Sequence, residues 1–289
     1  MLNFEGDSLI ALFNQFNSMV KIILFLIIWA VIWFPIAIPL ARLVKWQIAA
    51  PISNTQKLTF IISLYALAPI LTWAMITLEQ TSLEKIGLIF QASLFKSILF
   101  GYGLGIITTF IIDALELVTG SLKLNNQEDS TPNNIWLNLP ILLFLSFFIA
   151  SIEELIFRGI FVNFLREDFN IWLSAIISSV IFALLHLIWE QKNTLPQLPG
   201  LFFMGIVLFY ARIIDNGSLG LAIGLHGGWV FVLACIDTFN IFSYNPKQKS
   251  WLIGKKDQPL GSIAGLGVLL LTSLFLVFQS SRLLVFPFS

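Results

Sequence analysis

The chain contains repeated apolar runs, each long enough to cross or nearly cross a lipid bilayer. A transmembrane helix needs about 20 consecutive apolar residues. These runs lack the alternation of period two that membrane β-barrel strands require. We therefore expect an all-α, polytopic integral membrane helical bundle with about eight transmembrane helices. The runs cover residues 22–41, 58–78, 97–119, 135–165, 171–189, 198–214, 218–236 and 260–280.

Composition and charge support a multi-pass membrane protein and argue against other classes. Hydrophobic residues make up 57% of the chain and charged residues only 11%, which is too little charge for the surface of a soluble domain. The 16 basic and 16 acidic residues balance, so no basic face for nucleic acid is expected. The single cysteine, Cys235, excludes an internal disulfide and a zinc-thiolate site.

Polar connections divide the chain into three parts. Residues 1–134 hold N-terminal transmembrane helices, together with a shorter amphipathic segment at 83–96. We expect this segment to form a helix in the membrane interface. Residues 135–245 form a helical core, and residues 246–289 hold a polar loop and the last transmembrane helix.

The core carries three charged residues within an apolar run, in "FFIASIEELIFRGIFVNF". An ionisable group at the centre of a membrane helix costs about 2.5–3.5 kcal/mol, so such groups are expected to be paired or functional. Glu154 and Arg158 are spaced i, i+4 with the acid first, which favours an ion pair on one helix face. Glu153 lies about 100° around the helix, so it must find a partner on another helix.

Both histidines of the chain, His186 and His226, also lie in apolar runs. A single histidine in such a place is more often a hydrogen-bonded core residue than a ligand. Two histidines and one unpaired carboxylate, however, form the set that a buried hydrolytic site needs. The carboxylate of Glu153 can deprotonate water, and the imidazoles can orient that water, donate to an oxyanion or bind a metal.

These residues resemble the motifs of the CPBP family of intramembrane proteases, also known as the CAAX-protease and bacteriocin-processing or Abi family. The family motifs run EExxxR, FxxxH and HxxxN. "EELIFR" at 153–158 matches the first motif and "FALLH" at 182–186 matches the second. "HGGWV" supplies His226 but places Val230 where the family commonly has Asn. The resemblance covers roughly residues 140–240.

The resemblance implies an intramembrane endopeptidase of the type II CAAX prenyl endopeptidase kind, in which residues 135–245 are the catalytic core. Glu153 and His186 would activate water, Glu154 and Arg158 would support the site, and His226 would stabilise the oxyanion. The implied partner is a membrane-bound protein or peptide substrate, such as a prenylated CAAX-type protein or a bacteriocin precursor.

Val230 departs from the family pattern because its side chain cannot donate a hydrogen bond. Loss of one oxyanion donor typically costs about 10²–10³ in rate. The Trp229 indole or the backbone N–H groups of Gly227 and Gly228 are alternative donors. The departure also leaves open a catalytically silent membrane adaptor or immunity-type protein.

A divalent metal such as zinc is the cofactor that the family's naming implies, with Glu153, His186 and His226 as ligands. The same residues equally fit a water activated by glutamate without metal. A function of another class is a proton- or cation-coupled transporter that uses these three residues as an ion path. Such transporters usually show broken helices or repeated halves, and the sequence shows no repeat.

Overall fold

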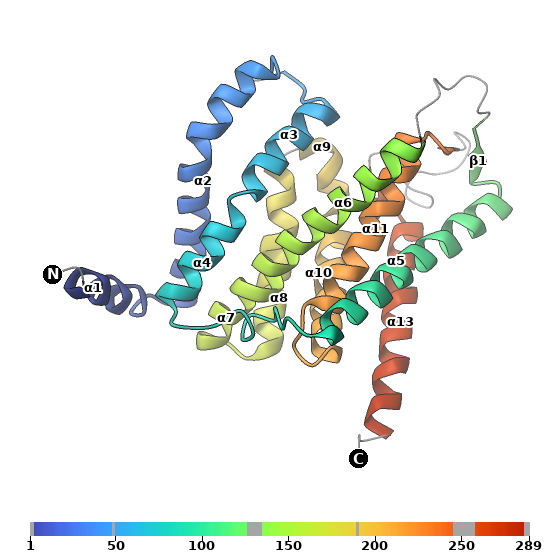
Figure 1. Cartoon of the computed structure of the whole chain (residues 1–289). Coiled ribbons are helices and arrows are strands. Elements are labelled where there is room, and N and C mark those ends of the chain that lie inside the picture. Colours follow the sequence, from blue (N-terminus) through green and yellow to red (C-terminus); the bar gives the residue numbers. More distant parts are fainter. Residues whose placement is uncertain (1–2, 48–49, 126–134, 189–190, 245–257, 286–289) are drawn as a thin grey trace.

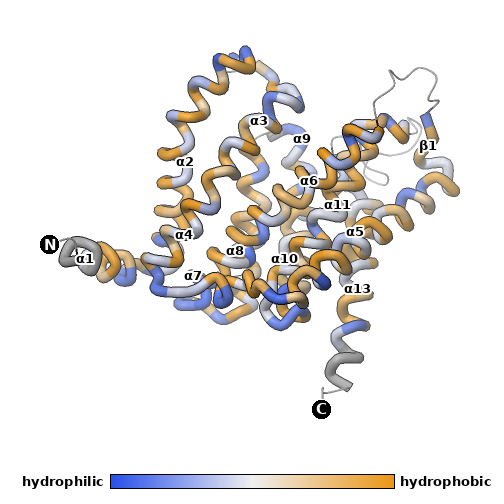
Figure 2. Tube along the Cα trace, viewed as in Figure 1, coloured by the Kyte–Doolittle hydropathy of each residue, from blue (hydrophilic) through white to orange (hydrophobic). Residues whose placement is uncertain are grey.

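The computed structural model describes residues 3–47, 50–125, 135–188, 191–244 and 258–285, and it is almost entirely helical (Figure 1). Within these residues, eight helical segments are long and apolar enough to cross a membrane, which confirms the expected polytopic bundle. Apolar residues cover most of the long helices, whereas polar residues gather mainly at helix ends and connections (Figure 2). The protein is therefore an integral, multi-pass membrane protein.

Among the described residues, the N-terminal half of the chain forms five helices. They are α1 (Asn3–Phe13), α2 (Ser18–Leu43), α3 (Asn54–Tyr65), α4 (Ala68–Leu78) and α5 (Ala92–Val118). Helix α1 was not predicted from the sequence. Helix α2 and the α3–α4 pair form a hairpin, and α5 packs along α11 (Figure 1).

The C-terminal half forms the rest of the bundle. Its helices are α6 (Ile135–Glu154), α7 (Val162–Asp168), α8 (Ile171–Leu185), α9 (Gln191–Thr194), α10 (Leu198–Ile214), α11 (Gly220–Thr238) and α13 (Ile263–Val285). A π-helical segment, Leu155–Phe161, joins α6 to α7, and short 3₁₀ turns lie at His186–Ile188, Leu195–Gln197 and Pro259–Gly261. Strands β1 (Leu122–Leu124) and β2 (Phe242–Tyr244) pair antiparallel and join the ends of α5 and α11.

The run predicted at 58–78 is one membrane span made of two helices. Pro69 lies in the first turn of α4, where its missing N–H leaves no hydrogen bond unmade. In a continuous helix the N–H at position 69 would donate to the carbonyl of Tyr65, and because proline has no N–H the helix is interrupted after α3. The break makes Tyr65 the last residue of α3.

An ion-pair cluster fixes the hairpin to the rest of the bundle. The Nζ of Lys21 lies 2.7 Å from Glu79 Oε1 at the end of α4 and 2.7 Å from Glu167 Oε2 on α7. Lys21 is only 1% exposed, and the rings of Phe25 on α2 and Phe161 in the π-helical segment meet edge to face at 5.4 Å. The hairpin is therefore held against the segment that follows the two glutamates.

The prediction of a helix over 83–96 is wrong for residues 83–91, and the place of this segment in the membrane interface stays a prediction. Residues 81–91 form turns and irregular backbone, and α5 begins only at Ala92. Gly87 has φ +99°, which is outside the helical region, and its carbonyl accepts a hydrogen bond from Leu219 N. Ile86 is 2% exposed. Residues 86–87 of the segment are thus packed against the start of α11, whereas Leu83 and Phe90 are exposed.

Helices α5 and α11 approach until their backbones touch. A Cβ on Gly105 of α5 would lie 2.7 Å from the carbonyl oxygen of Leu225, and one on Gly224 of α11 would lie 2.2 Å from that of Ile98. Small residues permit such contact between membrane helices. The close packing fixes the position of α11, which carries His226.

Replacing Gly105 with alanine should therefore destabilise the bundle. The added methyl group has no space, and overpacking of this kind typically costs about 1–3 kcal/mol. Gly103→Ala is the matched control on the same helix, because no atom of the described residues lies within 4 Å of its Cβ position. Thermal unfolding in detergent should show a lowered midpoint for Gly105→Ala alone, and equal midpoints would contradict the packing described.

Candidate active site

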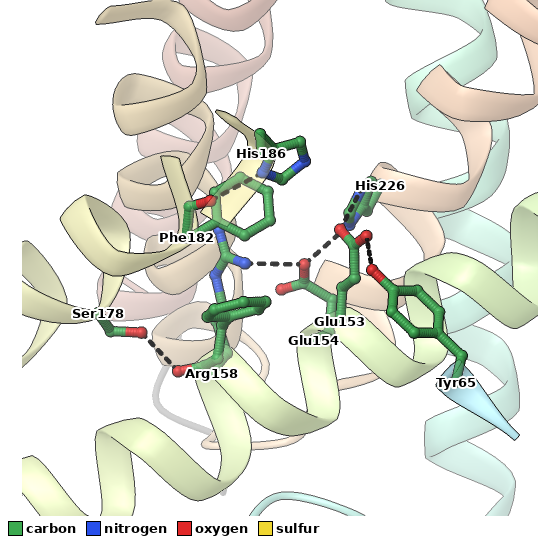
Figure 3. A network of polar contacts seen from close by, with 9 residues as sticks. Tyr65, Glu153, Glu154, Arg158, Ser178, Phe182, His186 and His226 are labelled. Atoms are coloured by element: carbon green, nitrogen blue, oxygen red, sulfur yellow. Dashed lines mark hydrogen bonds and ion pairs between the residues drawn. The ribbon is translucent and has the colours of Figure 1, made fainter. Parts of the chain in front are cut away.

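The two glutamates end α6, and Arg158 lies in the π-helical segment that follows them. A π-helical turn replaces i+4 hydrogen bonds by i+5 bonds and is frequent at functional sites. The hydroxyl of Ser178 on α8 donates to the carbonyl of Phe157 in this segment over 2.6 Å (Figure 3). Helix α8 therefore braces the π-helical segment, which follows the two glutamates and carries Arg158.

The ion pair predicted from the i, i+4 spacing is present. Arg158 Nη1 donates to Glu154 Oε1 over 3.1 Å, and both side chains are almost completely buried. The guanidinium group also lies over the ring of Phe182, with 4.3 Å between its central carbon and the ring centroid. The pair neutralises itself within the protein and does not line the cavity described below.

Glu154 also holds His226, a contact that the sequence did not predict. The Nδ1 of His226 lies 2.8 Å from Glu154 Oε1. Because a carboxylate oxygen accepts hydrogen bonds, Nδ1 carries a proton in this contact. The ring is thereby oriented so that Nε2 lies 3.6 Å from Glu153 Oε2 (Figure 3). Glu154 thus connects Arg158 to the histidine of α11.

Glu153 receives its second contact from Tyr65, which sequence reasoning missed. The hydroxyl of Tyr65 on α3 donates to Glu153 Oε1 over 2.5 Å (Figure 3). Glu153 is 7% exposed. Among the described residues, His226 is the only basic residue with a side-chain nitrogen within 4.0 Å of the Glu153 carboxylate oxygens. Within this part of the chain, Glu153 is therefore buried without a lysine or arginine partner, as its place on the helix predicted.

His186 starts the 3₁₀ turn after α8 and faces the same space. Its Nδ1 lies 2.7 Å from the carbonyl oxygen of Phe182, so Nδ1 carries the proton in the neutral ring. No hydrogen bond to Nε2 occurs within the described part of the chain. The Phe182 ring contacts both imidazoles, at centroid distances of 4.5 Å to His186 and 6.2 Å to His226.

These side chains open into a cavity of about 780 Å³. This size lies within the range of ordinary ligand sites, about 300–1,000 Å³. The polar groups of Glu153, His186, His226 and Tyr65 line it, surrounded by apolar and aromatic side chains from α2, α3, α10, α11 and α13. Val230 also lines the cavity and offers it no hydrogen bond.

The alternative oxyanion donors near His226 are already engaged. The indole N–H of Trp229 donates to Thr108 Oγ1 over 3.3 Å. Helix α11 runs without interruption through Gly227 and Gly228, so their N–H groups belong to the helix. Both glycines instead let Tyr102 of α5 approach. A Cβ on Gly227 would lie 2.8 Å from the Tyr102 ring, and one on Gly228 would lie 2.4 Å from the Tyr102 carbonyl oxygen. Their role is helix packing.

The fit of a metal can be tested on the same contacts. Among the described residues, no group of three or more His, Cys, Asp or Glu side chains is placed to hold an ion. Glu153 Oε1 and the Nδ1 atoms of His186 and His226 already form hydrogen bonds with protein groups. The described residues do not gather the predicted ligand set, and zinc stays a prediction.

Two comparisons with known proteins each match a part of the chain. Residues 135–232 match the family model described as "Type II CAAX prenyl endopeptidase Rce1-like", which confirms the resemblance over that segment. A curated Escherichia coli relative, "Uncharacterized 24.3 kDa protein", is 37% identical over 83 residues, which cover 27% of this chain and 37% of the relative. No solved structure matches the chain. All five predicted site residues lie within the matched segment, whereas Tyr65 lies outside it.

Proposed function

We propose that the protein is an intramembrane endopeptidase that hydrolyses a peptide bond of a membrane-associated protein or peptide. The observation that carries this proposal is the environment of Glu153. Among the described residues its carboxylate is buried without a lysine or arginine partner, and it faces the cavity shared with His186 and His226. The family match over residues 135–232 supports protease activity at these residues.

The first step needs a water molecule beside Glu153 and His186. The Nε2 of His186, which carries no proton in this tautomer, accepts a hydrogen bond from this water and orients it. Glu153 removes a proton as the water oxygen attacks the carbonyl carbon, so a C–O bond forms and the carbonyl electrons move onto the oxygen. General base catalysis of this kind contributes typically about 10²–10⁴ in rate.

The second step stabilises and then breaks the tetrahedral intermediate. His226 holds one proton on Nδ1 against Glu154, so Nε2 donates to the oxyanion only when the ring carries both protons. A ring that enters the reaction with both protons offsets the Glu153 carboxylate before the attack and the oxyanion after Glu153 has taken the water proton, since Glu154 and Arg158 already neutralise each other. The intermediate collapses when the C–N bond breaks and the proton on Glu153 passes to the amine.

The cavity favours a substrate that approaches from the membrane. Its walls are mainly apolar and aromatic, and several come from helices that span the bilayer. A prenylated CAAX-type protein or another membrane-anchored peptide fits such walls. With Val230 in the wall, we expect turnover about 10²–10³ slower than at a site with a second oxyanion donor.

The proposal is tested with purified protein in liposomes that contain membrane-anchored peptides. The wild type should cleave at least one peptide, and His186→Ala and His226→Ala should each lose about 10²-fold or more in rate. A parallel assay with a chelator distinguishes water activation by a metal from water activation by Glu153 without metal, because only a metal-dependent reaction stops when the metal is removed. Wild-type rates in both histidine variants would refute the proposed site.

A further inference from the structure

The contact between Tyr65 and Glu153 joins the proposed base to a helix outside the family match. The two residues are 88 positions apart, and their oxygen atoms lie 2.5 Å apart. Tyr65 also lines the cavity, together with Glu153 and His226. A short hydrogen bond to a buried carboxylate restricts the orientation of that carboxylate.

Helix α2 holds Tyr65 in place. The rings of Trp29 and Tyr65 lie 5.9 Å apart with a 30° angle between their planes. The indole N–H of Trp29 donates to the carbonyl of Leu64 over 2.9 Å, and that of Trp33 donates to Ser63 Oγ over 3.0 Å. The end of α3 is therefore fixed from both its backbone and its side chains, and the hydroxyl of Tyr65 is presented to Glu153 in advance.

The bond distinguishes the two oxygens of Glu153. Oε1 is occupied by the Tyr65 hydroxyl, whereas Oε2 faces the Nε2 of His226 at 3.6 Å. Because Oε1 carries the tyrosine bond, Oε2 is the oxygen that is left to receive the water proton. That proton would then lie next to His226, the residue proposed to donate a hydrogen bond to the oxyanion.

We propose that Tyr65 is a positioning residue that fixes the carboxylate of Glu153 and assigns the base function to Oε2. The inference rests on the proposed function and makes the α2–α3 hairpin a part of the catalytic site. Tyr65 keeps its own proton throughout. Oε2 takes the proton from water and later releases it to the amine. The protons therefore balance without a further reactant.

Tyr65→Phe tests this role because it removes the hydroxyl and keeps the ring against Trp29. We expect kcat to fall about 10- to 100-fold, which is the rate loss typical of a misplaced reacting group. KM should change less than about twofold, and the unfolding midpoint should stay unchanged. Tyr210→Phe is the matched control, since it removes a hydroxyl bonded to Ser280 Oγ at 3.0 Å on another face of the bundle. This control should keep the wild-type kcat.

A second readout is the infrared carboxylate band of Glu153, identified as the band that Glu153→Gln removes. Tyr65→Phe should shift this band, and Tyr210→Phe should not. An unshifted band, a wild-type kcat in Tyr65→Phe, or a loss of kcat that only follows a loss of stability would overturn the positioning role. Absence of cleavage by the wild type itself would overturn the proposed function, and this inference with it.

Discussion

Glu153→Gln is expected to abolish peptide hydrolysis while leaving the fold nearly unchanged. Glutamine retains the volume of the side chain and a carbonyl oxygen that accepts the hydrogen bond of Tyr65. It cannot take a proton from water, so kcat should fall by about 10²–10⁴, the usual contribution of a general base. The measurement is kcat for a membrane-anchored peptide in liposomes, with thermal unfolding in detergent beside it.

The unfolding midpoint controls for loss of structure in this variant. A midpoint equal to that of the wild type, together with lost cleavage, assigns the effect to chemistry. A Glu153→Gln protein that cleaves at a rate close to that of the wild type would remove Glu153 from the role of base.

Glu154→Ala is expected to act in the opposite way, mainly on stability. Glu154 is 0% exposed and accepts from both Arg158 and His226. Its removal leaves the Arg158 charge buried without its partner, and breaking a buried pair in this way typically costs about 3–5 kcal/mol. We expect a much lower unfolding midpoint and a reduced yield of folded protein, measured in the same detergent as the wild type.

A double variant shows whether the lost stability comes from the unpaired charge. Glu154→Ala combined with Arg158→Met removes both members of the pair, so part of the lost stability should return. No recovery would mean that the charge is not the cause. Equal behaviour of Glu154→Ala and Glu153→Gln would contradict the division of roles between the adjacent glutamates.

The membrane bundle and the residues of the site could be predicted because each depends on a local rule. A bilayer requires long apolar helices, so hydropathy predicted the eight spans found among the described residues. The spacing of Glu154 and Arg158 predicted their ion pair. The cost of ionisable groups in a membrane singled out Glu153, His186 and His226, which line one cavity.

Contacts between distant helices were beyond these rules. Tyr65 meets Glu153 across 88 positions, and His226 meets Glu154 across 72. Neither periodicity nor spacing contains information on such pairs. The helix predicted over 83–96 was wrong at residues 83–91 for a related reason, since an amphipathic pattern does not reveal the contact that Gly87, with φ +99°, makes with the start of α11.

The most direct test of water activation by Glu153 is a search for new peptide termini by mass spectrometry. Purified wild type and Glu153→Gln are incubated in liposomes with the same library of membrane-anchored peptides. We expect new amino and carboxyl termini at defined bonds with the wild type and none with Glu153→Gln. Identical products from both proteins, or no products from either, would contradict peptide hydrolysis by Glu153-activated water.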